Sequence, residues 1–372
     1  MRYGGDDVVL SSGTVQKRIC VLVCRNGLGH FRRIVTIVHA LNKRGPLCRV
    51  DVVCARWQVE QLTDWPALKT LTAQAGTTFI FLDLYPCWHD AAASPDRRLL
   101  TWHEWLRPLG LDQYDLVVSD NLVEALYYQP ETVLSGSFLW HDVYERAFPD
   151  VPLLKEYAQR SQALLRDHRP AMIANRYFAM PAIREQTQPV EVGMLPFATT
   201  DASAGPGQVL DILFAGGSYP EIAETMGAYL GGLAASGSIP GAVRLWMDRR
   251  VAGTQQDLPG LHRFDYDRQR FAHLDAVVAR PGMGVISDCI ATGTPLFCIH
   301  EANPEMQHNA SVLEALGLGW RLLAVQEAVD YIVGWYRTPG AYETYRQRIA
   351  QIDNQGLEQT VDFLLKRLEA VW

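Results

Sequence analysis

The chain has 372 residues, 48% of them apolar and 20% charged, which is typical of a globular protein long enough for two domains. Its formal net charge of -7 argues against nucleic acid as a main partner, because neutralising phosphates requires a basic surface. No apolar run approaches the roughly 20 residues of a membrane-spanning helix. Residues 1–16 lack the apolar core of a signal peptide, so we expect a cytoplasmic protein without a transmembrane segment.

The seven cysteines show no C-x-x-C spacing, and most of them lie in apolar, strand-like runs. This pattern predicts buried, reduced thiols rather than disulfides or a metal site. The set is Cys20, Cys24, Cys48, Cys54, Cys87, Cys289 and Cys298.

Strand-like and helical segments alternate through the first half of the chain. A helix is expected over residues 31–44, where apolar residues recur at helical spacing until Gly45-Pro46. Strands alternating with helices imply right-handed βαβ crossovers and a parallel sheet. The strands are expected at 17–24, 49–54, 78–84 and 116–119, with weaker candidates at 132–139 and 171–174.

A second α/β series follows residues 199–208 (TTDASAGPGQ), whose small and polar residues are typical of a linker. Its strands are expected at 209–214, 244–247, 262–264, 275–279 and 296–299, and the tail after Gln326 is helical by pattern. The sequence therefore predicts an α/β protein with two domains, which together enclose a cleft suited to a ligand. The predicted parts are a flexible tail at 1–16, a first domain at 17–198, the linker at 199–208, a second domain at 209–355 and a terminal helical segment at 356–372.

The first glycine turn, Gly27-x-Gly29, follows the first strand and opens the first helix. A dinucleotide fingerprint requires a third glycine where this chain has Arg32, and an acidic residue near the end of the second strand, where it has Arg56. An NAD site is therefore not favoured. Arg56 keeps open an NADP site, since an arginine there accommodates the 2′-phosphate.

Residues 277–309 contain two strand ends that are each followed by a helix. An apolar strand at 274–279 leads through Arg280–Gly284 (RPGMG) into a helix at 285–292, and a strand at 295–299 leads into a helix at Glu305. Helix N-termini offer unpaired N–H groups and a partial positive charge, which suit a phosphate at the carboxyl edge of a parallel sheet. Gly282 and Gly284 allow close backbone approach. The pattern indicates a site for the diphosphate and sugar of a nucleotide sugar, and the alternative is an ordinary strand–turn–helix.

This segment, with RPGMG, Ser287-Asp288 and EMQHNA at 305–310, resembles the donor-binding segment of GT-B glycosyltransferases. The similarity is closest to the group containing the peptidoglycan N-acetylglucosaminyltransferase and the UDP-glycosyltransferases. NGLGHFRR at 26–33 matches the start of the same family, so the resemblance covers most of residues 17–320. It implies a GT-B fold, in which two Rossmann-like doubly wound domains face each other across a cleft. The first would bind the acceptor, the second the nucleotide-sugar donor, and the last helix would pack back on the first domain.

The resemblance also implies an inverting mechanism in which His30 is the general base and takes the proton of the acceptor. Histidine suits this role because its ordinary pKa lies near neutrality. Asp120, which ends the strand-like LVVSD segment, would orient the imidazole. The alternatives for His30 are a bond to the helix-start backbone or a bond to the sugar phosphate. Arg32 and Arg33 are candidates for contact with the diphosphate, with an acidic acceptor or with solvent.

For the donor, Gly216-Gly217-Ser218 match the family's glycine-rich turn, and Phe264 with its backbone would hold the nucleobase. Asp288 stands where relatives place a ribose-binding glutamate, and Glu305 matches an acid that contacts sugar hydroxyls. Met306 replaces the family's glutamine, which leaves the donor sugar open. Arg280 either meets phosphate or pairs with an acid. The residues expected to bind the donor are Gly216, Gly217, Ser218, Phe264, Arg280, Gly282, Met283, Gly284, Asp288, Glu305 and Asn309.

Aromatic residues gather in the first half of the chain. Trp102, Trp105 and Leu106 share one helical face, which Pro108 interrupts. Two interpretations are open, core packing or the wall of an acceptor pocket. The residues expected to bind the acceptor are Gly29, Arg32, Trp88, Trp102 and Trp140.

We therefore expect a metal-independent transferase without a cofactor, which uses a UDP- or dTDP-sugar and a small-molecule or lipid-linked acceptor. Asp265-Tyr266-Asp267 formally match the metal-binding triplet of the other glycosyltransferase fold, but such a triplet arises easily by chance. The alternatives are a nucleotide-sugar hydrolase or epimerase of the same fold, and a non-catalytic nucleotide-sugar-binding partner. The oligomeric state is left open.

Overall fold

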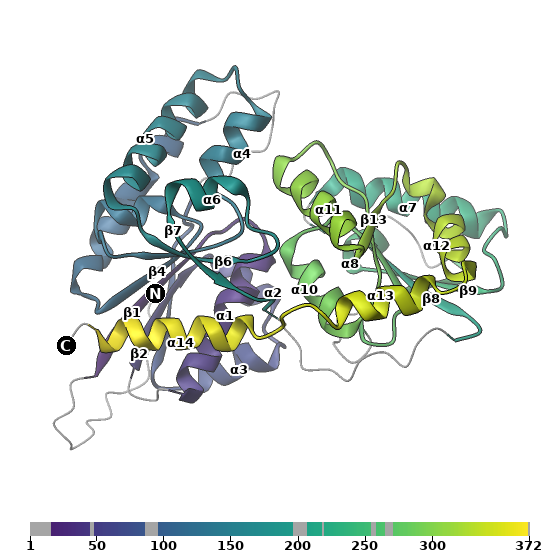
Figure 1. Ribbon diagram of the computed structural model, residues 1–372, viewed down its shortest axis with the longest axis horizontal. Helices are drawn as coiled ribbons and strands as arrows, with labels where there is room; N and C mark the ends of the chain where they lie inside the picture. The colour runs from purple at the N-terminus through teal and green to yellow at the C-terminus, as the bar shows by residue number, and fades with distance from the viewer. Residues whose placement is uncertain are drawn as a thin grey trace. The chain divides into compact units, whose positions relative to one another are not determined.

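The computed structural model describes residues 16–44, 48–85, 96–195, 207–217, 219–253, 258–264 and 271–370. The chain divides into two compact units, and in Figure 1 the first is coloured purple to teal and also contains the yellow C-terminal helix. The first unit comprises Met1–Leu195 and Gln355–Trp372, and the second comprises Pro196–Asn354. Most of the predicted tail at 1–16 and of the predicted linker at 199–208 lies outside the described residues.

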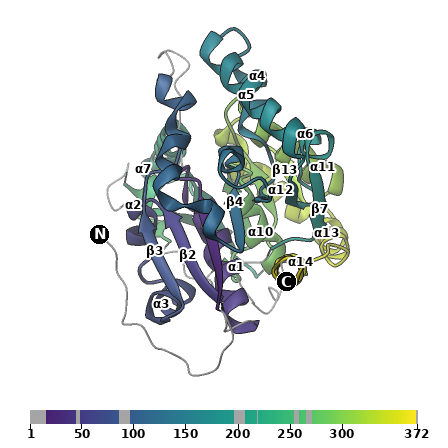
Figure 2. The ribbon, with the colours of Figure 1, turned by 90° about the vertical axis from the view of Figure 1, so that its left-hand side faces the viewer.

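The first unit is built on a seven-stranded parallel sheet in the order β3-β2-β1-β4-β5-β6-β7. These strands run side by side in the view of Figure 2. All residues of β4 and β6 are buried, because a parallel sheet is covered by helices on both faces. The strands are β1 Lys17–Val23, β2 Cys48–Cys54, β3 Thr77–Phe81, β4 Leu116–Asp120, β5 Val133–Ser135, β6 Ala171–Asn175 and β7 Gln188–Val192.

Among its described residues this unit has three buried apolar clusters, of which the smallest lies around β5, β6, α5 and α6. The two larger ones cover the rest of the sheet. One joins the sheet to α1, α3 and α14, and the other joins it to α4, α5 and the 3₁₀ helices η1 and η2. The α-helices are α1 Leu28–Arg44, α2 Arg56–Gln61, α3 Pro66–Ala73, α4 Trp140–Ala147, α5 Pro152–His168, α6 Pro181–Gln186 and α14 Gly356–Glu369. The 3₁₀ helices are η1 Arg97–Leu100, η2 Trp102–Leu109, η3 Leu111–Gln113 and η4 Val123–Tyr127.

The last helix, α14, returns to the first unit and runs alongside α1 (Figure 1). Its buried face contributes Val361, Leu364 and Leu368 to the core. At its start, the Gly356 N–H donates to Met194 O over 3.0 Å. A Cβ on Gly356 would lie 2.3 Å from Gly193 O, so the helix approaches this backbone as closely as it does because the residue is glycine.

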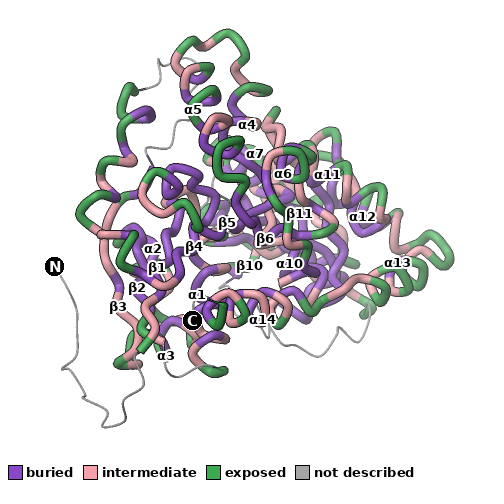
Figure 3. The backbone as a smooth tube through the Cα atoms, turned by 60° about the vertical axis from the view of Figure 1, so that its left-hand side comes forward, coloured by how far each residue is buried: buried purple, intermediate pink, exposed green. Residues whose placement is uncertain are grey.

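The second unit contains a six-stranded parallel sheet in the order β10-β9-β8-β11-β12-β13. In both units most of the central strands are buried, whereas the edge strands β7 and β10 are mostly exposed or half-buried, and the helices expose their outer faces (Figure 3). The strands are β8 Leu210–Ala215, β9 Val243–Met247, β10 Leu261–Arg263, β11 Ala276–Ala279, β12 Leu296–Cys298 and β13 Gly319–Arg321. The helices are α7 Pro220–Ala235, α8 Arg249–Ala252, α10 Met283–Thr292, α11 Pro304–Leu316, η5 Val325–Glu327, α12 Ala328–Arg337 and α13 Ala341–Ile349.

The expected α/β class, with two parallel sheets, is confirmed, whereas two local expectations differ from the structure and strand β13 was not expected. The strand expected at 132–139 spans only Val133–Ser135, because the chain turns at Gly136 and enters α4 at Trp140. Strand β13 has three residues and no run of β-branched side chains, so the pattern does not identify it. The aromatic segment from Trp102 forms a 3₁₀ helix that runs through Pro108 and ends at Gly110, whose φ is 59°.

The cysteines in the described ranges are free thiols, and five of those six are buried. Burial raises the pKa of the Cys54 thiol to about 12, so this thiol is protonated and unreactive at neutral pH. Cys87 lies outside the described residues. None of the helices in the described ranges is long and apolar enough to cross a membrane.

Candidate active site

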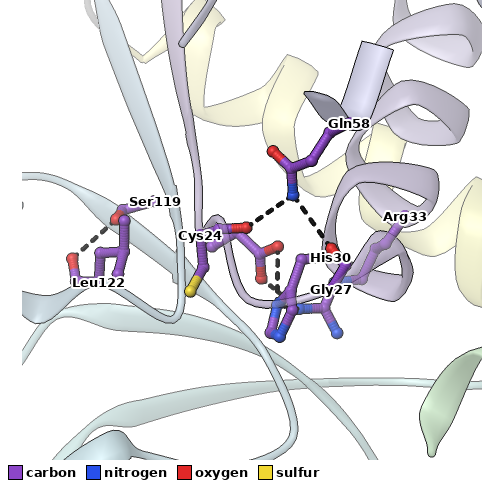
Figure 4. Close-up of polar contacts among 8 residues, drawn as sticks. Cys24, Gly27, His30, Arg33, Gln58, Ser119 and Leu122 are labelled. Carbon is purple, nitrogen blue, oxygen red and sulfur yellow. Dashed lines mark hydrogen bonds and ion pairs between the residues drawn. The ribbon is translucent and has the colours of Figure 1, made fainter. Parts of the chain in front are cut away.

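The turn between β1 and α1 is held in place from a neighbouring element. Gly27 has a φ of 91°, and its N–H donates to Arg25 O over 2.9 Å. The buried side chain of Gln58, on α2, donates through Nε2 to Cys24 O and to Gly27 O, each over 3.0 Å (Figure 4). Its Oε1 accepts the N–H of Ala55. Gln58 therefore fixes the turn that carries His30, and the sequence pattern did not single it out.

His30 and Asp120 meet at the carboxyl edge of the first sheet. His30 is the third residue of α1, and Asp120 is the last residue of β4, where it pairs with Val23 of β1. The distance from His30 Nδ1 to Asp120 Oδ2 is 3.1 Å, and the Asp120 side chain is 0% exposed. An ionised carboxylate only accepts hydrogen bonds, so Nδ1 carries the ring proton and Nε2 is left as the basic nitrogen.

Arg33 contacts the other oxygen of the same carboxylate. It lies three residues after His30, on the same face of α1, and its Nη2 donates to Asp120 Oδ1. Figure 4 shows the His30 and Arg33 side chains next to each other. Burial raises the pKa of Asp120, but the attraction of Arg33 and then of His30 outweighs burial, and the pKa falls below its ordinary value. The carboxylate is therefore ionised at neutral pH.

In the second unit, the turn from β11 into α10 presents backbone N–H groups. Helix α10 begins at Met283, and its N-cap, Gly282, supplies no side-chain hydrogen bond. The N–H groups of the first helical turn have no partner within the helix. A Cβ on Gly282 would meet nothing within 4 Å, and residues 282–285 are partly exposed. This turn has room for an anion beside its donors, although the N–H of Gly282 itself donates to Arg280 O.

The glycine turn after β8 differs from the expectation. Gly216 is buried, its N–H donates to Asp248 Oδ2 over 3.1 Å, and a Cβ there would lie 2.5 Å from the Ala223 Cβ. Its N–H is thus occupied by a carboxylate, and the glycine lets α7 pack on β8. Gly217 is exposed with a φ of 64°, whereas Ser218 lies outside the described residues.

Arg280 pairs with an acid, which was one of the two expectations for it. Its Nε donates to Glu301 Oε2 over 2.8 Å, and its Nη2 donates to Glu301 Oε1. The guanidinium also lies over the Tyr219 ring, 5.5 Å from its centroid. Glu301 therefore already neutralises the positive charge of Arg280 that would otherwise pair with a phosphate.

The start of α11 also differs from the expectation of two open helix N-termini. The Asn303 side chain caps this helix and accepts the N–H groups of Glu305 and Met306. Asn309 is 0% exposed, and its Nδ2 donates to Pro281 O over 2.9 Å. Because the side chain is buried, it cannot contact a nucleotide-sugar donor in this conformation. It instead holds the backbone of the β11–α10 turn.

Three further residues expected at the site are buried or half-buried. Asp288 lies in α10 and is 6% exposed, so a ribose reaches its carboxylate only if its surroundings move. The Phe264 ring is buried beside Trp246 and Phe271, and its N–H donates to Met247 O. Its ring and its N–H are therefore engaged in packing within the second unit. Glu305 is half-buried at the start of α11.

The tryptophans expected to line an acceptor pocket are part of the core. Trp102 is 0% exposed and packs edge-on against Tyr85, with ring centroids 5.9 Å apart. Trp140 is also buried, and it stacks on Tyr85 at 5.1 Å. Core packing is therefore the interpretation that describes both side chains. Of the other residues expected to bind the acceptor, Gly29 is exposed, Arg32 is half-buried and Trp88 lies outside the described residues.

The arrangement of the strands and helices matches solved structures along nearly the whole chain. LpCGTa in complex with UDP aligns with a TM-score of 0.66 and 14% identity, covering 95% of this chain and 99% of that one. An Arabidopsis thaliana glycosyltransferase complexed with quercetin aligns with a TM-score of 0.66 and 13% identity, covering 95% and 100%. The chain has the GT-B fold.

A third GT-B structure, the spinosyn rhamnosyltransferase SpnG complexed with thymidine diphosphate, aligns with a TM-score of 0.59 and 15% identity, covering 93% of this chain and 100% of that one. No protein-family model and no curated protein matches the chain. The resemblance inferred from the glycine turns is thereby confirmed as a likeness of fold.

Proposed function

We propose that this GT-B protein is an inverting glycosyltransferase that moves a sugar from a UDP- or dTDP-sugar to a hydroxyl or amine of an acceptor. The observation that carries the proposal is the contact between His30 Nδ1 and the buried Asp120 carboxylate, which leaves Nε2 as a base. Structures of the same fold contain UDP, thymidine diphosphate or quercetin, which supports a nucleotide-sugar donor and a hydroxyl acceptor.

In the proposed reaction, His30 Nε2 takes the proton from the acceptor as the acceptor's oxygen or nitrogen attacks the anomeric carbon. The bond between that carbon and the diphosphate oxygen breaks in the same step, and its electron pair leaves with the diphosphate. Inversion follows because attack comes from the face opposite the leaving group. The charge of Asp120 stabilises the imidazolium that forms.

The departing diphosphate is stabilised by donors whose position does not change during the reaction. In the second unit, the uncapped first turn of α10 and the partly exposed glycine Gly282 are suited to this role. Such groups act strongly because no reorganisation is needed as charge develops. Glu305 is the candidate for contact with sugar hydroxyls, since it is half-buried while Asp288 is enclosed.

The test begins with a thermal-shift screen of UDP, dTDP and their sugars, because a ligand of the folded state raises the melting temperature. Donor sugars that bind are then incubated with a panel of hydroxyl and amine acceptors, and products are identified by mass spectrometry. Transfer to an acceptor supports the proposal. Free sugar from the donor alone identifies a hydrolase instead.

The variant His30→Ala is expected to lower kcat by roughly 10²- to 10⁴-fold, the usual contribution of a general base, with little change in the Kd of the nucleotide. His39→Ala is the matched control, because His39 is half-buried on the same helix and lies outside the His30–Asp120 pair. Unchanged turnover in His30→Ala would remove the base assignment.

A further inference from the structure

Among the described residues, each oxygen of the buried Asp120 carboxylate has one contact, and both contacts come from α1. His30 Nδ1 lies at Oδ2, and Arg33 Nη2 donates to Oδ1. A buried carboxylate is costly unless it is paired and hydrogen-bonded. With Oδ1 held by the guanidinium, rotation of the carboxylate about its Cβ–Cγ bond is restricted and Oδ2 stays directed at the imidazole.

Arg33 also acts on His30 through its charge. Its Nη2 lies 3.5 Å from His30 Nδ1, and both nitrogens are donors when Nδ1 carries the ring proton. Asp120 alone would favour the imidazolium, because an opposite charge stabilises the charged form. The arginine offsets that charge and repels a second proton on the ring. A general base has to be unprotonated before the acceptor arrives, so this balance matters for the chemistry.

The other groups around the pair come from several elements. On the turn before α1, Arg25 faces Asp83 at 3.9 Å, and their side chains are 39% and 60% exposed. From α2 the neutral Gln58 contacts the turn, and after β5 the Phe138 ring lies edge-on to His30 at 6.3 Å. On α1 itself, Arg32 is half-buried next to Arg33. Within the described ranges, Arg33 is the cation that contacts the Asp120 carboxylate.

We propose that Arg33 is a positioning residue of the His30–Asp120 pair, which holds the carboxylate in the orientation that His30 needs and offsets the carboxylate's charge beside the imidazole. This inference rests on the proposed function for its role in turnover. The effect of the Arg33 charge on the His30 ring is a property of the unliganded protein, so it can be measured without any substrate.

The test is a titration of the His30 ring by ¹⁵N NMR in protein labelled at histidine, with the signal assigned by its loss in His30→Ala. Arg33→Gln is expected to raise the titration midpoint of His30 by about one unit or more, the usual effect of one neighbouring charge. Arg33→Lys keeps the charge but not the planar guanidinium. The His30 midpoint in this variant is therefore expected to lie between those of the wild type and Arg33→Gln. Equal midpoints in the wild type and Arg33→Gln would overturn the inference.

Arg44→Gln is the matched control for the loss of an arginine. Arg44 lies on the same helix and pairs with Asp362 over 2.6 Å, but both side chains are about half exposed. Its removal is expected to leave the His30 midpoint unchanged. Because Arg33→Gln leaves a buried carboxylate uncompensated, it is paired with the double variant Arg33→Gln/Asp120→Asn, which is neutral at both positions. The double variant is expected to fold and to bring the midpoint back toward that of the wild type, and a midpoint still raised as in Arg33→Gln would contradict the charge argument.

Turnover gives a second measurement. In Arg33→Gln the acidic limb of the profile of kcat/KM against pH is expected to move to higher pH, with kcat/KM at pH 7 lowered roughly threefold and recovered at higher pH. A purely structural defect would lower kcat equally at all pH values, and that result would overturn the inference. If the titration shifts while no sugar transfer is found, the positioning role stands and the transferase assignment fails.

Discussion

Asn309 offers a direct test of how the candidate diphosphate turn is built. Its fully buried Nδ2 donates to Pro281 O, in the turn between β11 and α10, across 28 residues of sequence. Asn309→Ala removes this donor and leaves a buried carbonyl unpaired, which costs about 1–3 kcal/mol. Asn309→Asp keeps the shape but places an acceptor-only carboxylate against the carbonyl. An uncompensated buried charge costs about 3–5 kcal/mol, so the aspartate variant is expected to be the less stable one.

The assay combines urea unfolding with hydrogen exchange measured by mass spectrometry on peptides that cover residues 280–292. In both variants these peptides are expected to exchange faster than in the wild type, because the turn has lost its attachment to α11. Binding of UDP, or of whichever nucleotide the screen identifies, is expected to weaken in parallel. Ser311→Ala is the control, since this exposed residue of α11 donates to Gln307 O and accepts from Arg321 Nη2, and neither contact involves the turn. An aspartate variant that matches the wild type in both measurements would refute this reasoning.

Two other predictions concern stability. Gly356→Ala is expected to destabilise the first unit by about 1–3 kcal/mol, because its Cβ would lie 2.3 Å from Gly193 O. Gly334→Ala, in α12 with nothing within 4 Å of its Cβ, is the control and is expected to be neutral or stabilising by up to about 1 kcal/mol. Equal denaturation midpoints for the two variants would contradict the close packing of α14. Burial raises the pKa of Glu124 to about 7, so the native state holds this proton more tightly than the unfolded chain and loses stability as pH rises from about 5 to 8. Relative to the wild type, Glu124→Gln is therefore expected to gain up to about 3 kcal/mol over that range in urea unfolding; a difference independent of pH would rule out a protonated buried carboxyl.

Much of the architecture follows from local pattern. The strands expected at 17–24 and 116–119 correspond to β1 and β4, and the helix expected at 31–44 corresponds to most of α1. Apolar runs, helical spacing and glycine turns carry this information, because each depends on residues close together in the chain. The motif resemblance extends the same kind of information to the GT-B fold. Strand β13 is missed because its sequence, Gly319-Trp320-Arg321, contains no β-branched residue.

The contacts of individual side chains at the candidate site do not follow from local pattern, because they depend on the tertiary structure. Gly216, Asn309 and Trp102 match motifs or aromatic patterns associated with binding, yet the folded chain buries all three. Sequence separation explains why a motif does not reveal this. Gly216 meets Asp248 across 32 residues, and which groups become buried depends on how distant elements pack.

By itself, then, the sequence determined the order of strands and helices, the two glycine turns and the types of residue at them. Only the tertiary structure decided which of those residues face one another. It brought Arg33 to the far oxygen of Asp120, 87 residues away, and it enclosed that carboxylate completely. The physical reason is that a buried charge must find its partners in space, whereas a periodic pattern records only neighbours along the chain.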